Sequence, residues 1–359
     1  MSENRYWQNE LDEYIKQGEP SKAERSDAWK TAIGLQDVDG LKTSDYLLDT
    51  AKEHIEGKIN IGDVQKRIES YYQQSDSRKQ IEQNTKEADI VSARIAALLG
   101  EKTFQFSPAE YKEIHRRLFE GVFDHAGKIR TYNITKKEWV LNGDTVTYAS
   151  FDSINATLDY DFGVEKEYDY SGVSVKEAVK HIAKFASDIW QIHPFGEGNT
   201  RATAVFVIKY LKSFGFEVSN DIFADNSWYF RNALVRANYN NLKNGIVATT
   251  KYLELFFENL LLGSNNELKN RYLHIDSDQS AIQSAKSDIS KCQNVTLEEL
   301  AIINAIKTNP KITQMQLAGV IGKSDRTVKR YMDEMQEKGL IRRKNGKRNG
   351  EWEILVEAF

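Results

Sequence analysis

The chain has a single cysteine, Cys292, and only four prolines among its 359 residues. One cysteine excludes an internal disulfide framework and a zinc site built from several cysteines. No apolar run is longer than that of residues 204–208, which ends at Lys209 and is far too short to cross a bilayer. The N-terminus also lacks the basic-then-apolar layout of a signal peptide. We therefore expect a cytoplasmic protein that makes no membrane contact.

An excess of charge of one sign is also missing. The 49 Lys and Arg residues are balanced by 53 Asp and Glu residues, which gives a formal net charge of −4. A protein that coats nucleic acid or membranes would be far more basic, so any contact with a polyanion must come from a local patch. The hydrophobic content of 40% is ordinary for a globular chain, and the length suits two or three domains.

The sequence divides into four segments, and the scarcity of proline favours a mainly α fold. Residues 1–75 are predicted to form a small helical domain, 76–262 a larger domain of long helices, 263–293 a polar linker and 294–359 a C-terminal domain. Within the larger domain, Asn142-Gly143 separates two β-favouring runs, and both residues tolerate positive φ. This pattern predicts a β-hairpin over residues 138–148.

The last segment is typical of a winged helix-turn-helix. Apolar residues at helical spacing predict a first helix that ends near Asn309 and a second over residues 314–321. Ser324 is a good N-cap for a third helix. Two strands, residues 340–344 and 352–356, are predicted to follow around a turn rich in Asn, Gly, Lys and Arg.

The most informative segment is His193-Pro-Phe-Gly-Glu-Gly-Asn-Thr-Arg201, which links two apolar helical stretches. N–H groups at the start of the second helix form a ready anion site, and Gly196 and Gly198 let the backbone approach a phosphate closely. Arg201 can grip phosphate oxygens with its planar fork. Glu197 would repel a bare phosphate, so its predicted partner is a magnesium ion that bridges phosphate oxygens. Since His193 can take a proton from a hydroxyl, the segment predicts transfer from a nucleoside triphosphate to a hydroxyl.

This signature resembles that of Fic (Fido) domains, helical enzymes that usually transfer AMP from ATP to a protein hydroxyl. Residues 113–119 and 126–130 are similar to the family's upstream helix and turn, and the resemblance covers roughly residues 85–262. It implies ATP and Mg²⁺ as cofactors and a Tyr, Ser or Thr acceptor, either in the protein itself or in a target protein. It assigns the base to His193, the metal to Glu197, the anion hole to Gly198 and Asn199, and the outer phosphates to Arg201.

The same resemblance identifies the hairpin expected at 138–148 with the family's flap, which holds a target segment by strand pairing. Glu138, Trp139 and Val140 are the flap residues expected to bind the target. Tyr229 or Phe230 is a weaker candidate for packing the adenine, and both are better explained as core residues.

Two positions depart from the family's pattern. The usual Gly between Asn and Arg is Thr200, whose β-branched side chain can either narrow the pocket or supply a hydroxyl hydrogen bond. The family's second arginine, three residues after Arg201, is Ala204. That arginine normally helps to hold the γ-phosphate or pairs with an inhibitory glutamate, so its loss leaves the orientation of ATP open.

Residues 28–72 resemble the VbhA-type antitoxin, a small helical partner of Fic toxins, fused here in the same chain. The antitoxin motif is Ser/Thr-x-x-x-Glu-Gly, and alignment on Gly40 places Asp39 at the glutamate and Leu35 at the Ser/Thr position. Both sides of the inhibitory ion pair are thus altered. We expect a regulatory domain that no longer inhibits through that pair, with a purely structural helical bundle as an equal alternative.

Between Lys323 and Arg348 the sequence holds ten basic residues against four acidic ones. They fall on the two elements that a winged helix presents to duplex DNA. We expect the basic residues of the third helix to face the major groove and those of the strand turn to follow phosphates. A solvated basic face, or a surface for protein contact or homodimer formation, is the alternative. The candidate residues are Arg326, Lys329, Arg330, Arg343 and Lys347.

The sequence therefore predicts a protein adenylyltransferase of the Fic type that is associated with DNA. One alternative is a DNA-binding regulator whose Fic core has become a nucleotide sensor, and another is a Fic protein that transfers phosphate. The presence of His193, Glu197, Asn199 and Arg201 favours the enzyme.

Overall fold

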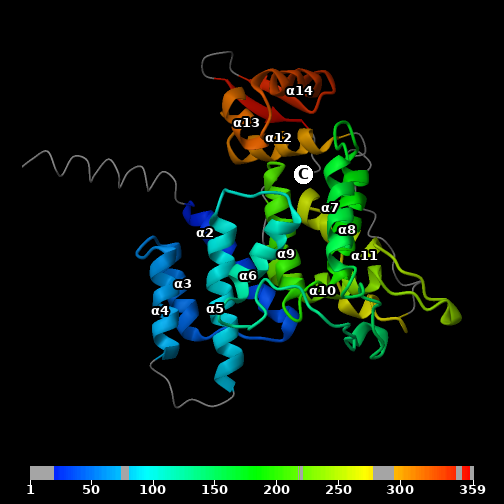
Figure 1. Ribbon diagram of the computed structural model, residues 1–359. Helices are drawn as coiled ribbons and strands as arrows, with labels where there is room; N and C mark the ends of the chain where they lie inside the picture. Colours follow the sequence, from blue (N-terminus) through cyan, green and yellow to red (C-terminus); the bar gives the residue numbers. More distant parts are fainter. Residues whose placement is uncertain are drawn as a thin grey trace, which may run out of the picture. The chain divides into compact units, whose positions relative to one another are not determined.

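The structure, a computed structural model, describes residues 20–73, 81–216, 218, 221–277, 295–344 and 350–355. Within these ranges it contains thirteen α-helices and one two-stranded antiparallel sheet, which confirms the mainly α fold class (Figure 1). The chain divides into two compact units, residues 1–103 and 104–359. None of the described helices combines the length and the apolar character needed to cross a membrane.

All regular secondary structure in the described part of the first unit is helical. Its elements are α2 (Lys22–Gly34), η1 (Leu35–Asp39), α3 (Asp45–Ile55), α4 (Ile61–Gln73) and α5 (Ile81–Gly100). Asp89 on α5 joins two of the other helices, because its carboxylate accepts hydrogen bonds from Ser44, the N-cap of α3, and from the hydroxyl of Tyr72 on α4. A buried carboxylate needs such donors, so Asp89 fixes how α3 and α4 pack on α5.

The core of the second unit surrounds α9. The elements before the C-terminal domain are α6 (Pro108–Phe119), η2 (Trp139–Leu141), α7 (Ile154–Glu167), α8 (Val175–Ile192), α9 (Asn199–Ser213), α10 (Asp221–Ala237), η3 (Leu242–Asn244), α11 (Lys251–Leu262) and η4 (Asn270–Tyr272). Every residue of α9 from Asn199 to Leu211 is buried, and the helix packs against both α6 and α8 (Figure 1). Its polar side chains find partners inside the core, as where the Thr203 and Tyr111 hydroxyls lie 2.8 Å apart. The N-terminus of α9, where the motif ends, is therefore held rigidly.

The structure has a 3₁₀ turn where the sequence predicted strands. Asn142 and Gly143 adopt the predicted positive φ, 55° and 85°, but residues 139–141 form η2. The Glu138 N–H donates to the Asp144 carbonyl and the Gly143 N–H donates to the Glu138 carbonyl, both at 2.9 Å. Because the Leu141 N–H also turns back to Glu138, these bonds close a tight loop instead of a strand ladder. We call residues 138–148 the flap loop.

The C-terminal domain has the predicted order of three helices and two strands. These are α12 (Leu297–Thr308), α13 (Gln314–Ile321), α14 (Asp325–Glu337), β1 (Ile341–Lys344) and β2 (Glu351–Ile354). The Ser324 side chain caps α14 as predicted, because it accepts from the Thr327 N–H at 3.3 Å. The strands pair antiparallel, with Arg343 opposite Trp352.

Candidate active site

His193 lies at the turn between α8 and α9. It ends α8 in the left-handed conformation, with φ 49° and ψ 58°, and its N–H donates to the Trp190 carbonyl at 3.1 Å. A histidine with positive φ is uncommon, so the surrounding structure must hold it there. The loop then runs through residues 194–198 to α9, which begins at Asn199.

Arg130 supplies much of that support. Its guanidinium donates to the His193 carbonyl at 2.8 Å and to the Ile192 carbonyl at 3.3 Å, while its own N–H donates to the Pro194 carbonyl at 2.8 Å. Three consecutive carbonyl groups around the turn are thus bound by one residue. The sequence placed Arg130 in a family-like turn but gave it no role, since only the folded chain shows what its side chain reaches.

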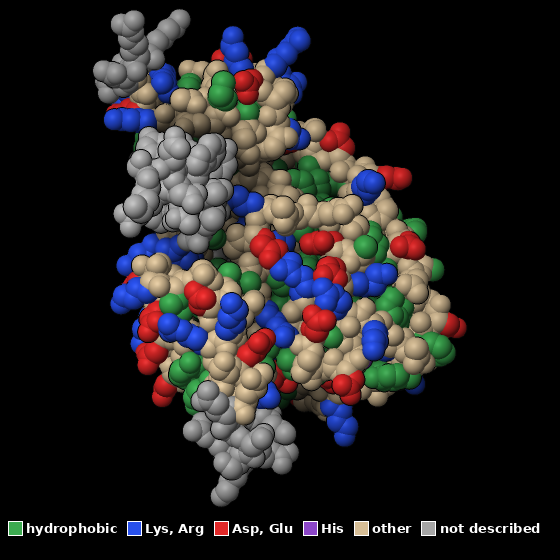
Figure 2. All heavy atoms as spheres, turned by 60° about the vertical axis from the view of Figure 1, so that its left-hand side comes forward, with side chains coloured by type: hydrophobic (Ala, Val, Ile, Leu, Met, Phe, Trp, Pro, Cys, Tyr) green, Lys and Arg blue, Asp and Glu red, His purple; other side chains and the backbone are tan. Residues whose placement is uncertain are grey.

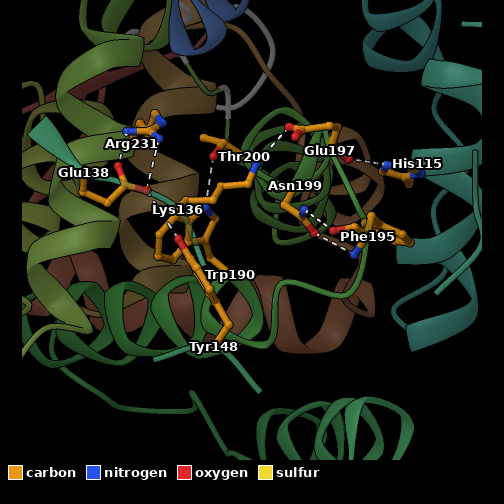
Figure 3. A network of polar contacts seen from close by, with 10 residues as sticks. All are labelled: His115, Lys136, Glu138, Tyr148, Trp190, Phe195, Glu197, Asn199, Thr200 and Arg231. Carbon is orange, nitrogen blue, oxygen red and sulfur yellow. Dashed lines mark hydrogen bonds and ion pairs between the residues drawn. The ribbon is translucent and has the colours of Figure 1, made fainter. Parts of the chain in front are cut away.

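Two further side chains close the loop after His193. The Asn199 amide bonds both the N–H and the carbonyl of Phe195, at 3.0 and 2.8 Å (Figure 3). The His115 Nδ1 accepts from the Gly127 N–H, so its Nε2 carries the proton and donates to the Glu197 carbonyl at 2.9 Å. Burial lowers the pKa of His115 to about 3, which keeps this ring neutral. Asn199 is therefore a structural tie of the loop, and its predicted place in an anion hole stays a prediction.

The His193 ring is buried and surrounded by aromatic rings. The ring centroids of Tyr148 and Trp190 lie 4.3 and 5.4 Å from it. Among the described residues, neither ring nitrogen of His193 has a hydrogen-bond partner. Burial, followed by the positive charge of Lys136, holds the pKa of His193 well below its usual range. The side chain is thus a neutral imidazole whose two ring nitrogens are buried and unpaired, and the nitrogen without the proton can accept one from a hydroxyl that reaches it.

Gly198 is required by the packing of the loop itself. Its φ is 77°, and a Cβ atom there would lie 2.4 Å from the Phe119 ring. A Cβ atom on Gly196 would lie 3.0 Å from the Tyr132 hydroxyl. From the sequence, we predicted that both glycines let the backbone come close to a bound phosphate. The chain's own side chains already account for Gly198, and the phosphate contact remains a prediction.

Arg201 is buried, whereas the side chain of Glu197 is exposed to solvent. Arg201 is 1% exposed, with its guanidinium 4.8 Å from the centre of the Phe119 ring. The Glu197 side chain is 56% exposed and forms an ion pair with Lys136, whose Nζ lies 2.8 Å from Oε2 (Figure 3). The sequence did not predict this lysine, because 61 residues separate the two partners.

The two departures from the family's pattern are both buried. The Trp190 indole N–H donates to the Thr200 hydroxyl at 3.0 Å, so the hydroxyl supplies a hydrogen bond within the protein itself. Ala204 is completely buried in α9. In the first unit, Asp39 is exposed at the end of η1, whereas Leu35 is fully buried.

The three flap residues have different environments. Glu138 is buried and forms an ion pair with Arg231 at 2.6 Å, with the Tyr148 hydroxyl 3.4 Å from its carboxylate (Figure 3). Trp139 is 51% exposed, and Val140 is fully buried with its carbonyl accepting from the Ile275 N–H at 2.9 Å. Of these side chains only that of Trp139 is free to meet a target, and target binding at the flap loop remains a prediction.

Tyr229, the weaker candidate for adenine packing, is a buried residue of α10. Its hydroxyl donates to the Tyr252 carbonyl at 3.3 Å. This is the environment of a core residue, as the sequence also suggested. A role in nucleotide binding stays a prediction.

The basic residues of the C-terminal domain are largely exposed. Arg326, Lys329 and Arg330 are all exposed on α14, and Figure 2 shows Lys and Arg side chains projecting from this domain. Arg343 on β1 is half-buried, with its guanidinium 4.7 Å from the Trp352 ring centre. Lys347 lies outside the described residues.

Two family models match the chain. Residues 105–211 match the Fic/DOC family, and residues 299–342 match the winged helix-turn-helix DNA-binding model. The chain thus carries a Fic/DOC domain followed by a C-terminal winged helix-turn-helix. Among curated proteins it is distantly similar to the protein adenylyltransferase VbhT of Bartonella schoenbuchensis, with 25% identity over 117 residues. That match covers 33% of this chain and only 23% of the relative.

Solved structures give weaker similarities. The N-terminal FIC domain of the Bep8 protein from Bartonella sp. 1-1C matches with 18% identity and a TM-score of 0.40, over 52% of this chain and 87% of that one. A Fic family protein from Desulfovibrio desulfuricans G20 matches with 13% identity and a TM-score of 0.38, over 93% of this chain and 87% of that one.

Proposed function

We propose that this protein transfers AMP from ATP to the hydroxyl of a Tyr, Ser or Thr residue, in itself or in a target protein. The observation that carries the proposal is the His193 side chain, a buried neutral imidazole with neither ring nitrogen paired. The turn that holds it is fixed by Arg130, which donates hydrogen bonds to three of its carbonyl groups. The Fic/DOC match over residues 105–211 and the distant similarity to VbhT support the same reaction class.

In this reaction His193 takes the proton of the acceptor hydroxyl. The hydroxyl oxygen bonds to the α-phosphorus of ATP, and the bond from that phosphorus to pyrophosphate breaks. Arg201 binds phosphate oxygens, and the loop that Asn199 and His115 close keeps the phosphate-binding backbone in place. The low pKa of His193 keeps the ring unprotonated, and so able to accept, at neutral pH.

The residues present fit magnesium bound together with the nucleotide. The described part of the chain has no cluster of three or more His, Cys, Asp or Glu side chains that could form a complete metal site, so without the nucleotide a metal ion would bind only weakly, at Glu197. Mg²⁺ commonly binds through one carboxylate and the phosphates of its substrate, and the half-exposed Glu197 can supply that carboxylate. The ion would neutralise charge on the phosphates.

Transfer of label from ATP tests the proposal. ATP labelled at the α-phosphate should label the protein or its target, whereas ATP labelled at the γ-phosphate should not. Labelling from the γ-phosphate alone would identify a phosphate transferase instead. Absence of labelling from either position, with nucleotide binding retained, would indicate a nucleotide-sensing core.

The C-terminal domain favours a second activity, binding to duplex DNA. Its match to a DNA-binding model and the exposed basic residues on α14 support this proposal. Arg326, Lys329 and Arg330 would contact the major groove, with Arg343 and Lys347 near the phosphates. A DNA-binding regulator without transferase activity is the outcome expected if the labelling experiment fails.

The first unit is proposed to be regulatory, with Asp39 at the position of the antitoxin glutamate. Its shorter carboxylate and the alanine at position 204 imply that inhibition no longer depends on that ion pair. Asp39→Ala should therefore leave label transfer nearly unchanged. A large rise in activity would show that Asp39 still inhibits.

A further inference from the structure

Lys136 lies just before the flap loop, and its side chain reaches the loop of residues 194–198 that follows His193. Its ammonium lies 2.8 Å from Glu197 Oε2, and its side chain is only 26% exposed. Its backbone N–H donates to the Thr145 hydroxyl at 3.1 Å, so the residue is held against the returning arm of the flap loop. Figure 3 shows the side chain extending to Glu197. The lysine is therefore a fixed neighbour of the site and not a freely moving surface charge.

The same ammonium acts on the candidate base. After burial, the charge of Lys136 is the largest influence that lowers the pKa of His193. One cation is thus close enough to influence both the carboxylate proposed to hold the metal and the imidazole proposed to take the proton. Charges in a partly buried site are screened less than exposed charges, so one ammonium can act on both groups.

This position creates a competition for Glu197. The ammonium binds Glu197 Oε2 at 2.8 Å, and a Mg²⁺ ion on the same carboxylate would take an oxygen ligand at about 2.1 Å, which brings two cations within a few ångströms of each other. Their repulsion favours departure of the ammonium from Glu197 when a magnesium-bound nucleotide arrives, and phosphate oxygens are then the nearest anions available to it. The Lys136 ammonium thus exchanges one anionic partner for another and is not left without an anionic partner.

We propose that Lys136 is a positioning residue that holds the Glu197 carboxylate before nucleotide binds and then moves to the phosphates of the bound nucleotide. This inference rests on the proposed use of magnesium and ATP at the site. It predicts that loss of the lysine changes two affinities in opposite directions. Removal of the lysine charge should strengthen the binding of the metal alone and weaken the binding of the magnesium nucleotide.

The test compares Lys136→Gln with Lys137→Gln in the full chain. Lys137 is the exposed neighbour, so its substitution removes the same charge without the contact to Glu197. Mn²⁺, which prefers the same oxygen ligands as Mg²⁺, is titrated alone by electron paramagnetic resonance. A non-hydrolysable ATP analogue with an α,β-methylene bridge is titrated with Mg²⁺ by calorimetry. Neither measurement requires catalysis.

We expect Lys136→Gln to bind Mn²⁺ about threefold to tenfold more tightly and the magnesium analogue about tenfold more weakly. Lys136→Arg keeps the charge and should recover most of the analogue affinity, and Lys137→Gln should leave both affinities within about twofold of the original. Equal affinities in Lys136→Gln and the original protein, or shifts of both ligands in one direction, would overturn the inference while leaving the proposed function intact. If the original protein does not bind the magnesium analogue, the proposed function fails as well.

Discussion

Trp190 and Thr200 face each other across the turn that carries His193, and the indole N–H of Trp190 donates to the Thr200 hydroxyl at 3.0 Å. Both side chains are buried, so this bond ties the last turn of α8 to the first turn of α9. A glycine at position 200, as in the family's usual pattern, would leave the indole N–H without this acceptor. The departure from the pattern therefore has a structural role.

Thr200→Val tests that role. Valine keeps the β-branched shape but leaves a buried donor unsatisfied, which should lower the free energy of unfolding by about 1–3 kcal/mol. Thr200→Ser keeps the hydroxyl and loses only a methyl group, so its cost should be about 0.8 kcal/mol. Urea unfolding followed by tryptophan fluorescence measures both values. If valine costs no more than serine, the hydrogen bond contributes nothing.

Gly198→Ala should disturb the loop through its contact with Phe119. The positive φ costs about 1 kcal/mol for any other residue, and forcing the new methyl group against the ring at 2.4 Å adds about 1–3 kcal/mol. Gly172→Ala is the matched control, because Gly172 has a φ of 73° but no atom within 4 Å of an added Cβ. Thermal unfolding should rank Gly198→Ala as clearly the more damaging change. Equal losses would mean that Phe119 moves aside freely.

Asp161→Asn should stabilise the protein at neutral pH but not in acid. Burial, with the Asp188 charge as the next cause, raises the pKa of Asp161 to about 6, so the folded state holds this proton more tightly than the unfolded state. The ionised form is then destabilising above pH 6, and the penalty disappears as the pH falls below about 4.

Because Asp161 is only half-buried, we expect a gain of about 1 kcal/mol at pH 7.5 that shrinks toward zero at pH 4. Chemical unfolding at several pH values provides the measurement. Asp159→Asn, an exposed neighbour on α7, should change stability by less than about 0.5 kcal/mol. A constant gain at all pH values would exclude ionisation as its cause.

Binding to duplex DNA should weaken steeply with added salt. Each phosphate contact contributes about −0.9 to the slope of log K against log salt concentration, so the loss of one lysine that contacts phosphate should reduce the slope by about 1. Lys347→Ala, at a position proposed to lie near the phosphates, should show this change in fluorescence anisotropy titrations, while Lys243→Ala, an exposed lysine of η3, should not. Failure to bind duplex DNA at low salt would remove the proposal.

Local patterns in the sequence were sufficient for much of the fold. Ser324 caps α14 because a hydroxyl before a helical run satisfies its first N–H groups, and Asn142 and Gly143 turn the chain because both tolerate positive φ. The helix–loop–helix around His193 likewise follows from the glycines and the flanking apolar runs. These features depend on neighbouring residues only.

The missed features depend on residues far apart in the sequence. The sequence predicted Glu138 as a target-binding residue of the flap and gave no sign of its partner. In the folded chain Glu138 is buried and pairs with Arg231, 93 residues later. The packing of Gly198 against Phe119 and the pair of Lys136 with Glu197 have the same origin. No local pattern identifies such partners, because tertiary packing selects them.

The base assigned to His193 is the central claim, and His193→Asn tests it most directly. Asparagine tolerates the left-handed backbone at this position, so the loop should keep its shape. Initial rates of transfer from α-labelled ATP at saturating nucleotide, measured beside the affinity for the magnesium analogue, separate chemistry from binding. We predict a rate loss of at least about 100-fold with the affinity within about threefold of the original. A transfer rate within about threefold of the original would contradict the assignment.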